Sequence, residues 1–508
     1  MTSSFQPALL NLLRQRLSGI DGELLELNAK RRSLESERRM IEDTLKGVVY
    51  RIESLPADIL AEIFVHYVAG GAVIGMDESP MTRFGPPTRP AAVTGPLVLG
   101  AVCHTWRAVV LALPQLWAAV QIYTQNDFEA TEKLLNAWLP RAKSALLDVE
   151  IGLPKSTHRV LPMLAPYSKR WAALSCGIER GIPFAGNAVR GRVPKLRRLE
   201  LSLQLYGGPR VIPGKVDAFS VAPLLRDVHL VGFSPAVIEL PWAQLTKLQL
   251  GEVQVNYAVD VLRLTPRVED VTLGFDHDHW SQPQGPLPLR LPNLHTLKFD
   301  DEADFMQYLT LPALSTVYFT QGVEDPQQLE ELIARSQCSI VDMTLISGEV
   351  KYLIDVLKLV PSLVRLRVKN ITWATNSLIT LFSRLISGPQ QGTSSSDLPA
   401  TPLVPKLREV TLSPILSWIE IPYTKLAQLV SQRKAVGCPL DHIELVMAGR
   451  PYNPYDDGEP SSAEDVGRAL ETLLRGDHAT TACVKIRGLQ NIGPDTTAAS
   501  VMPPPYPE

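Results

Sequence analysis

A short hydrophobic motif recurs along most of the chain and limits its possible folds more than any other feature. The motif reads Leu-x-x-Leu-x-Leu with Val, Ile, Met or Phe replacements, often after a proline, as in VPKLRRLEL and LPNLHTLKF. Copies recur at about 20 to 29 residues, a period typical of stacked units that each supply one short strand. The copies are Leu146/Val149/Ile151, Leu196/Leu199/Leu201, Leu225/Val228/Leu230, Leu245/Leu248/Leu250, Val268/Val271/Leu273, Leu294/Leu297/Phe299, Leu314/Val317/Phe319, Ile340/Met343/Leu345, Leu363/Leu366/Val368, Leu407/Val410/Leu412 and Leu440/Ile443/Leu445.

This pattern predicts a degenerate leucine-rich-repeat solenoid over residues 124–490, with parallel strands and a concave face suited to binding protein. The helical stretches QQLEELIARS and KYLIDVLKLV are expected to cover its convex side. Two polar, Gly- and Pro-containing stretches, 388–404 and 449–465, interrupt the period and are expected to be surface loops. They either hold substrate specificity or only decorate the surface.

Residues 8–52 predict a long helix with a coiled-coil seam. Its apolar positions are spaced alternately by three and four residues: Leu10, Leu13, Leu17, Ile20, Leu24, Leu27, Leu34, Ile41, Leu45, Val48 and Ile52. Arg31 and Arg38 occupy two seam positions, and Gly19 and Gly22 each cost the helix about 1 kcal/mol relative to Ala. We therefore expect a weak coiled coil. It would self-associate, dock on a partner helix, or pack back on its own chain.

Two short apolar helices are predicted after this seam. Ser54 is a suitable N-cap, and Pro56 suits a first helical turn. The next helix has an apolar face too wide for one neighbour, formed by Ile59, Leu60, Ile63, Phe64, Tyr67 and Val68. A Gly/Pro-rich loop is expected over 69–95, and helical spacing then resumes through Leu99, Val102, Cys103, Trp106, Val109 and Val110. So small a module needs external support for its apolar surface.

These residues resemble the F-box-like module of fungal proteins that carry a short coiled coil before it and irregular leucine-rich repeats after it. The resemblance covers residues 50–123 in motif detail, through LPADIL, VCHTWRAVVLALPQLW and AAVQI, and defines a module at 53–123. It implies binding to the Skp-type adaptor of a cullin-RING ubiquitin ligase. The implied adaptor-facing or supporting residues are Leu55, Pro56, Ile59, Leu60, Phe64, Val102, Cys103, Trp106 and Trp117.

The overall expectation is thus a mixed α/β chain without catalytic residues that recruits an unknown protein substrate to a ligase. The alternative is a non-catalytic scaffold in which the module only caps the solenoid. The two differ in what substitution should do: replacing Ile59 and Leu60 with Asp abolishes adaptor binding in the first case, whereas a cap loses stability.

Composition and motifs argue against other classes of function. The net charge of −3 over 508 residues offers no basic field for nucleic acid. No apolar run is long enough to span a membrane, and we expect a cytoplasmic or nuclear protein. Five scattered cysteines, Cys103, Cys176, Cys338, Cys438 and Cys483, suggest neither disulfides nor a metal site. The polar run Asp276, His277, Asp278 and His279 lacks a remote ligand, so no metal or cofactor is predicted.

A Pro-rich, disordered tail is expected over 491–508. Within it, Pro503, Pro504 and Tyr506 match the Pro-Pro-x-Tyr ligand of WW domains. The alternative is an unstructured end without a partner.

Overall fold

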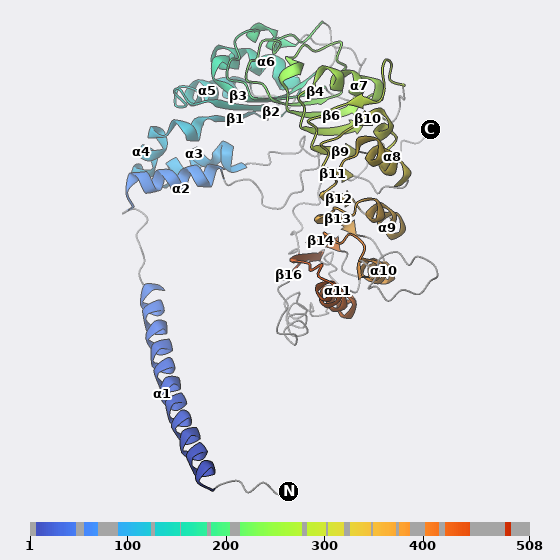
Figure 1. The fold of residues 1–508 in the computed structure, drawn as a ribbon. Coiled ribbons are helices and arrows are strands. Elements are labelled where there is room, and N and C mark those ends of the chain that lie inside the picture. The colour runs from blue at the N-terminus through green and yellow to red at the C-terminus, as the bar shows by residue number, and fades with distance from the viewer. Residues whose placement is uncertain are drawn as a thin grey trace, which may run out of the picture.

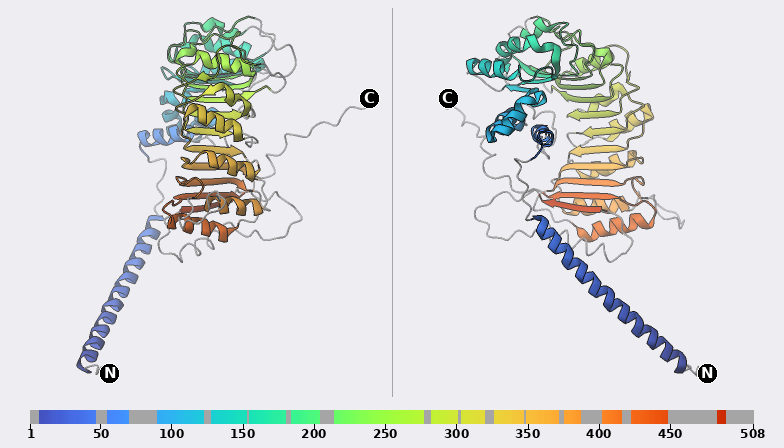
Figure 2. Two further views of the ribbon diagram at one scale, coloured as in Figure 1. Left: turned by 45° about the vertical axis from the view of Figure 1, so that its right-hand side comes forward. Right: turned by 90° about the vertical axis from the view of Figure 1, so that its left-hand side faces the viewer.

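The chain is a mixed α/β protein built around one long, curved parallel sheet (Figures 1 and 2). The computed structural model describes residues 7–46, 55–69, 90–122, 128–152, 154–179, 184–203, 214–276, 282–300, 303–319, 326–346, 349–371, 375–386, 402–415, 422–447 and 483–488. A long helix comes first, then a group of short helices, then the sheet with helices along its outer side. No helix in these ranges has the length and apolar character needed to cross a bilayer.

Within the described ranges the sheet contains 14 strands, all in sequence order and all parallel to their neighbours. They are β1 (Ala119–Ile122), β2 (Leu147–Ile151), β3 (Trp171–Ile178), β4 (Arg198–Leu203), β5 (Asp227–Val231), β6 (Lys247–Val253), β7 (Asp270–Phe275), β9 (Thr296–Asp300), β11 (Thr316–Phe319), β12 (Asp342–Ile346), β13 (Arg365–Ile371), β14 (Glu409–Ile415), β15 (His442–Met447) and β16 (Cys483–Gly488). Strands β8 (Leu289–Arg290) and β10 (Leu309–Thr310) form a separate parallel pair.

The repeated motif sets the register of this sheet. Its last two hydrophobic positions pair with the same positions in the next copy, as Leu199 does with Val228 and Val228 with Leu248. Side chains at these positions point to one face and form two continuous apolar columns, because successive residues of a strand alternate between faces. The predicted parallel strands are therefore confirmed at the motif copies.

Three details of the repeat differ from the prediction. The motif does not predict strand β3, because Trp171 and Cys176 stand at two of its leucine positions. It does not predict strand β16 either, because residues 483–488 lie far along the chain from the preceding copy. In the first copy the register is shifted by one residue. Leu146 is 42% exposed, whereas Leu147 is fully buried and pairs with Trp171.

Helices pack on the outer side of the sheet in several of its units. They are α5 (Phe128–Trp138), α6 (Pro154–Leu164), α7 (Val255–Leu264), α8 (Pro326–Ser336), α9 (Val350–Leu359), α10 (Thr375–Ile386) and α11 (Tyr423–Ala435). The predictions of helices at 327–336 and 351–360 are confirmed by α8 and α9. Short 3-10 turns replace the helix in other units: η4 (Ala185–Val189), η5 (Trp242–Gln244) and η6 (Ala303–Tyr308), while η3 (Ala165–Arg170) directly follows α6.

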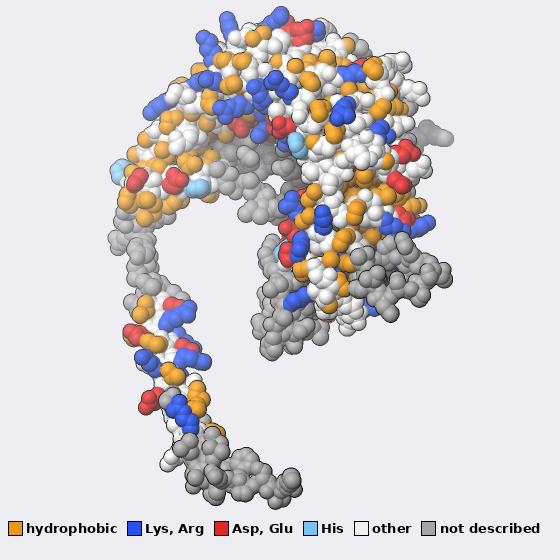
Figure 3. All heavy atoms as spheres, viewed as in Figure 1, with side chains coloured by type: hydrophobic (Ala, Val, Ile, Leu, Met, Phe, Trp, Pro, Cys, Tyr) orange, Lys and Arg blue, Asp and Glu red, His pale blue; other side chains and the backbone are white. Residues whose placement is uncertain are grey.

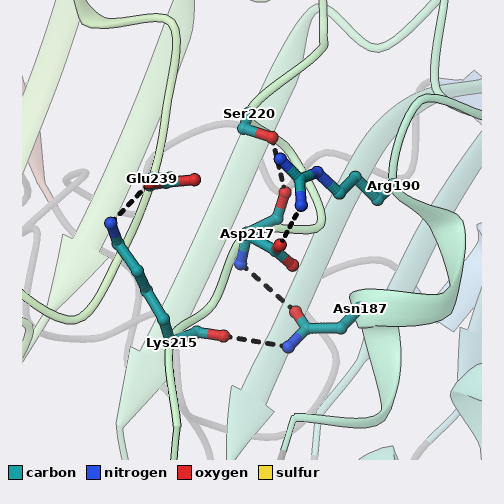
Figure 4. A network of polar contacts seen from close by, with 6 residues as sticks. All are labelled: Asn187, Arg190, Lys215, Asp217, Ser220 and Glu239. Carbon is teal, nitrogen blue, oxygen red and sulfur yellow. Dashed lines mark hydrogen bonds and ion pairs between the residues drawn. The ribbon is translucent and has the colours of Figure 1, made fainter.

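A side-chain network holds the units that lack an outer helix (Figure 4). The Asn187 side-chain amide donates to the carbonyl of Lys215 at 2.9 Å and accepts from the backbone N–H of Asp217 at 3.3 Å. The Asn187 side chain therefore bonds to the backbone of residues 215–217 as a neighbouring strand would. Arg190 contacts the Asp217 carboxylate at 2.7 Å. The hydrogen bond from Lys215, together with its positive charge, lowers the pKa of Glu239.

The buried thiol of Cys176 provides a test of the core. Cys176 lies in an apolar column of β3, and burial, followed by the negative charge of Glu200, raises the pKa of its thiol. Because the thiolate is the reactive form, iodoacetamide at mildly alkaline pH should leave Cys176 unmodified in the folded protein and modify it after denaturation. Mass spectrometry of the alkylated peptides measures this. Labelling of Cys176 at the rate of the half-buried Cys103 would contradict its placement.

Helix α1 (Pro7–Lys46) stands apart from the rest of the fold (Figure 1). The helix predicted over 8–52 is confirmed through Lys46, while residues 47–52 lie outside the described ranges. Every side chain of α1 that the structure describes is exposed, including those of the seam. Its apolar positions consequently find no cover within the described part of the chain.

Candidate partner-binding surface

Helix α2 (Ala57–Ala69) is positioned by its first turn and by one buried stripe. The backbone N–H of Leu60 donates to the carbonyl of Pro56 at 3.0 Å, which closes the first turn, and Asp58 lies near the N-terminus, where a negative charge is favourable. Leu60 and Phe64 are fully buried, and Val68 is nearly so. Their spacing of four residues places them on one side of the helix.

Two further helices complete the helical module, which we define as α2, α3 (Pro90–Val102) and α4 (His104–Ala112). The continuous helical stripe predicted across 99–110 is interrupted at Cys103, which has an extended backbone and caps α4 by accepting the N–H of Trp106 on Sγ at 3.5 Å. The loop predicted over 69–95 is also too long at its end, because α3 begins at Pro90; residues 70–89 lie outside the described ranges.

The core of the helical module is aromatic and tightly packed. The rings of Phe64 and Trp106 lie 4.8 Å apart between centroids. A Cβ atom at Gly95 would stand 2.9 Å from the Val68 Cγ2 atom, so any larger residue there would force Val68 or the helices to shift. The indole N–H of Trp106 is buried with no acceptor among the described residues.

The same helices also present apolar side chains to solvent. On α2 the exposed fractions are 47% for Ile59, 42% for Ile63 and 46% for Tyr67. This second stripe repeats at the same four-residue interval as the buried one. Helix α3 adds Leu97 and Val102, which are 48% and 57% exposed. Hydrophobic side chains accordingly gather over this part of the molecule in Figure 3. A clustered apolar surface of this kind is typical of a protein-interaction site.

The residues proposed from the resemblance fall into three groups. Those that are exposed are Pro56, Ile59 and Val102; those that are half-buried are Leu55, Cys103 and Trp106; those that are buried are Leu60, Phe64 and Trp117. Leu60 and Phe64 are buried in the core of the helical module, whereas Trp117 packs against Trp138 of α5. The test substitution suggested by the sequence, Asp at both Ile59 and Leu60, is therefore unsuitable, because charge at Leu60 would disrupt the core.

The helical module is joined to the sheet through two tryptophans. The 3-10 turn η2 (Pro114–Trp117) follows α4, as the proline in LPQLW predicts. Trp117 Nε1 donates to the carbonyl of Val110 at 2.9 Å, and Trp138 Nε1 donates to the carbonyl of Trp117 at 2.8 Å. The two rings meet edge to face at 4.7 Å, and Arg141 lies 4.8 Å over Trp117. These contacts fix the helical module against α5.

The boundary predicted at residue 123 also differs from the structure. Strand β1 lies within the predicted module, yet it pairs in parallel with β2 through Val120 and Val149. The sheet therefore begins at Ala119, and the last part of the predicted module is its first strand.

The sheet has an inner face on the side opposite α8–α11 (Figure 2), and polar side chains lie on this face. The Asp342 carboxylate forms ion pairs with Arg365 at 2.9 Å and with Arg367 at 2.8 Å. Asp342 lies on β12 and both arginines lie on the adjacent strand β13. Glu200 and His229 lie 3.4 Å apart and are both buried. Because neighbouring strands are about 4.8 Å apart, each polar side chain shields the side chain on the next strand from solvent. The face is charged and polar rather than apolar.

Several predicted features lie wholly or partly outside the described residues. These are Cys483 as a side chain, His277, Asp278 and His279, the loop 449–465, most of the loop 388–404, and the tail with Pro503, Pro504 and Tyr506. The described end of the loop 388–404 is not a surface segment, because Leu403 and Val404 are buried. Within the described ranges, no three His, Cys, Asp or Glu side chains come together as a candidate metal site.

A scan against protein-family models and a search of curated proteins both gave no match to this chain. The candidate surface is thus defined by its geometry: an exposed apolar stripe on α2, with exposed apolar residues on α3, above a well-packed core.

Proposed function

We propose that the chain is a non-enzymatic substrate receptor of a cullin-RING ubiquitin ligase, with an F-box-like module at α2–α4 and an irregular leucine-rich-repeat solenoid built on the sheet. The observation that carries the proposal is the division of α2 into two stripes. One side is committed to the core, while Ile59, Ile63 and Tyr67 remain exposed. An adaptor that covers this stripe would bury apolar surface, and each Å² buried would contribute about 25 cal/mol to the free energy of binding.

The inner face of the sheet would hold the protein substrate. Its strands present alternating charges, such as Asp342 beside Arg365 and Arg367, and these favour a polar partner segment over an apolar one. The chain needs no catalytic residue in this role. Holding a substrate next to a charged ubiquitin-conjugating enzyme raises the effective concentration of the acceptor lysine.

A second candidate function is favoured by the junction with the sheet. Strand β1 continues the sheet, and Trp117 and Trp138 bond the helical module to it. A module built in this way also serves as an N-terminal cap, since the end of a solenoid must be closed off from solvent. In that case the chain is a scaffold without a ligase.

Co-expression with a Skp-type adaptor separates these candidates. The receptor proposal expects an equimolar complex that survives size-exclusion chromatography with light scattering. A folded chain that elutes without the adaptor would favour the scaffold. Residues of the sheet should be unaffected by the adaptor in hydrogen exchange, whereas α2 and α3 should gain protection.

A further inference from the structure

Helix α1 has the features of one half of a two-stranded coiled coil. It is 40 residues long, and its seam residues are 42% to 64% exposed: Leu17, Ile20, Leu24, Leu27, Leu34 and Ile41. An isolated amphipathic helix gains little stability from its own propensity and depends on packing of its apolar face. Within the described residues this face contacts nothing, so it is available to another chain.

We propose that α1 pairs with α1 of a second copy of this chain, and that the two helices run antiparallel. Heptad numbering places Leu10, Leu17, Leu24, Arg31, Arg38 and Leu45 at a, and Leu13, Ile20, Leu27, Leu34 and Ile41 at d. In an antiparallel pair an a residue faces a d residue of the second copy. One register then places Leu24 against Leu27, Leu17 against Leu34 and Leu10 against Ile41.

The two arginines of the seam favour this orientation. In a parallel pair each a residue faces its own copy, so Arg31 would meet Arg31 and Arg38 would meet Arg38. In the antiparallel register they face Ile20 and Leu13 instead. Each can lay its aliphatic stem on that neighbour while its guanidinium stays with a carboxylate of its own helix. Arg31 lies 3.0 Å from Glu35, and Arg38 lies 2.8 Å from Glu42.

The flanking charges favour the same orientation. In an antiparallel pair g faces g and e faces e, which sets Arg16 against Glu37, Glu23 against Lys30 and Arg14 against Glu35, each pair occurring twice. Each of these contacts joins opposite charges.

A parallel pair has poorer charge complementarity, because each g residue faces the e residue of the following heptad. Arg16 then meets Asp21 and Lys30 meets Glu35, but Glu37 meets Glu42. Such flanking charges set the orientation of coiled coils. The three oppositely charged flanking pairs, together with the placement of the arginines, therefore select the antiparallel arrangement. A helix of 40 residues is about 60 Å long, so the two helical modules would be held at opposite ends of a rod.

Replacing Glu37 with Arg tests both the pairing and its direction, because the two orientations predict opposite signs. In the antiparallel dimer Glu37→Arg turns two attractive contacts with Arg16 repulsive, and the dissociation constant should rise about tenfold. In a parallel dimer it would relieve repulsion from Glu42 and tighten the dimer. Sedimentation equilibrium of the full-length chain, without adaptor, measures the constant.

Two further variants complete the test. Glu26→Arg makes the same change of charge at an exposed c position of α1 and should leave the dimer unchanged. Arg16→Glu combined with Glu37→Arg should restore the parent affinity. A monomeric parent protein, an unchanged constant in Glu37→Arg, or a tighter dimer would each overturn the proposal. Because the adaptor is absent from this experiment, its outcome is independent of the receptor function.

Discussion

Replacing Arg433 with Met is expected to lower the free energy of unfolding by at least about 3 kcal/mol, because several buried carbonyls lose a charged donor together. Arg433 lies in the last turn of α11 and is fully buried. Its guanidinium donates to the carbonyls of Leu385 at 3.0 Å, Leu403 at 3.1 Å and Val404 at 3.0 Å. Three further carbonyls accept from it, those of Pro405, Leu407 and Cys438.

This arginine joins three parts of the chain that the sequence separates. They are the end of α10, the segment that leads into β14, and the turn after α11. Burial lowers the pKa of Arg433, as does the positive charge of Arg408, yet a guanidinium remains protonated at neutral pH. Its charge is thus solvated entirely by backbone carbonyls among the described residues, and no described carboxylate pairs with it.

Two related variants make the Arg433 measurement specific. Lys at 433 keeps the charge but has fewer donors and no planar fork, so an intermediate loss is expected. Arg335→Met is the comparator at the corresponding end of α8, where only the carbonyls of Met306 and Leu309 accept, and it should cost less. Urea unfolding measures the total loss, and hydrogen exchange should locate it in α10, α11 and β14. A change below about 1 kcal/mol in Arg433→Met would contradict the role assigned to it.

The second large effect concerns adaptor binding. Ile59→Asp combined with Ile63→Asp should abolish the adaptor complex, since loss of an interface anchor commonly costs about 2 kcal/mol or more. Both side chains are more than 40% exposed, so the charge stays in solvent and the fold of the unbound chain should be retained. Co-purification from cells that express both proteins measures the complex, and circular dichroism checks the fold.

Matched controls separate docking from folding. Leu134→Asp on α5 introduces the same charge at a residue that is 48% exposed, close to the 47% of Ile59, and should leave the complex intact. Leu60→Asp should instead destabilise the helical module, because Leu60 is fully buried against its core. Undiminished co-purification of the Ile59/Ile63 variant would rule out docking through this stripe and leave the scaffold candidate in place.

Local pattern was enough to predict most of the sheet. The motif alternates apolar and polar residues with a period of two, and only a strand of that register buries one set of side chains while exposing the other. Leu248 and Leu250 illustrate this, since both are buried and both pair with the motif positions of the next strand. Strand β3 is not predicted by the motif, because Trp171, Leu174 and Cys176 meet the same packing requirement with an atypical set of residues.

The apolar face of α2 contains information that a local pattern does not carry. Its width indicated two contacts, but hydrophobicity is equal for Ile59 and Leu60, and nothing in their order reveals which one faces the core. Only the approach of α3 and α4 decides this, because Phe64 meets Trp106 on one side of the helix alone. The positive charge of Arg433 likewise gives no sign in the sequence that this side chain is buried, because the carbonyls that surround it come from residues up to 48 positions away.

The sequence by itself determined the strands at the motif copies, helices α8 and α9 and the heptad spacing of α1, because each depends on periodicity within a few residues. Tertiary structure decided which apolar residues of the helical module are buried, that β1 belongs to the sheet, and that an arginine completes the end of α10. These depend on contacts between segments distant in the chain. Such contacts are set by packing and by the need to satisfy buried polar groups, and neither leaves a local pattern.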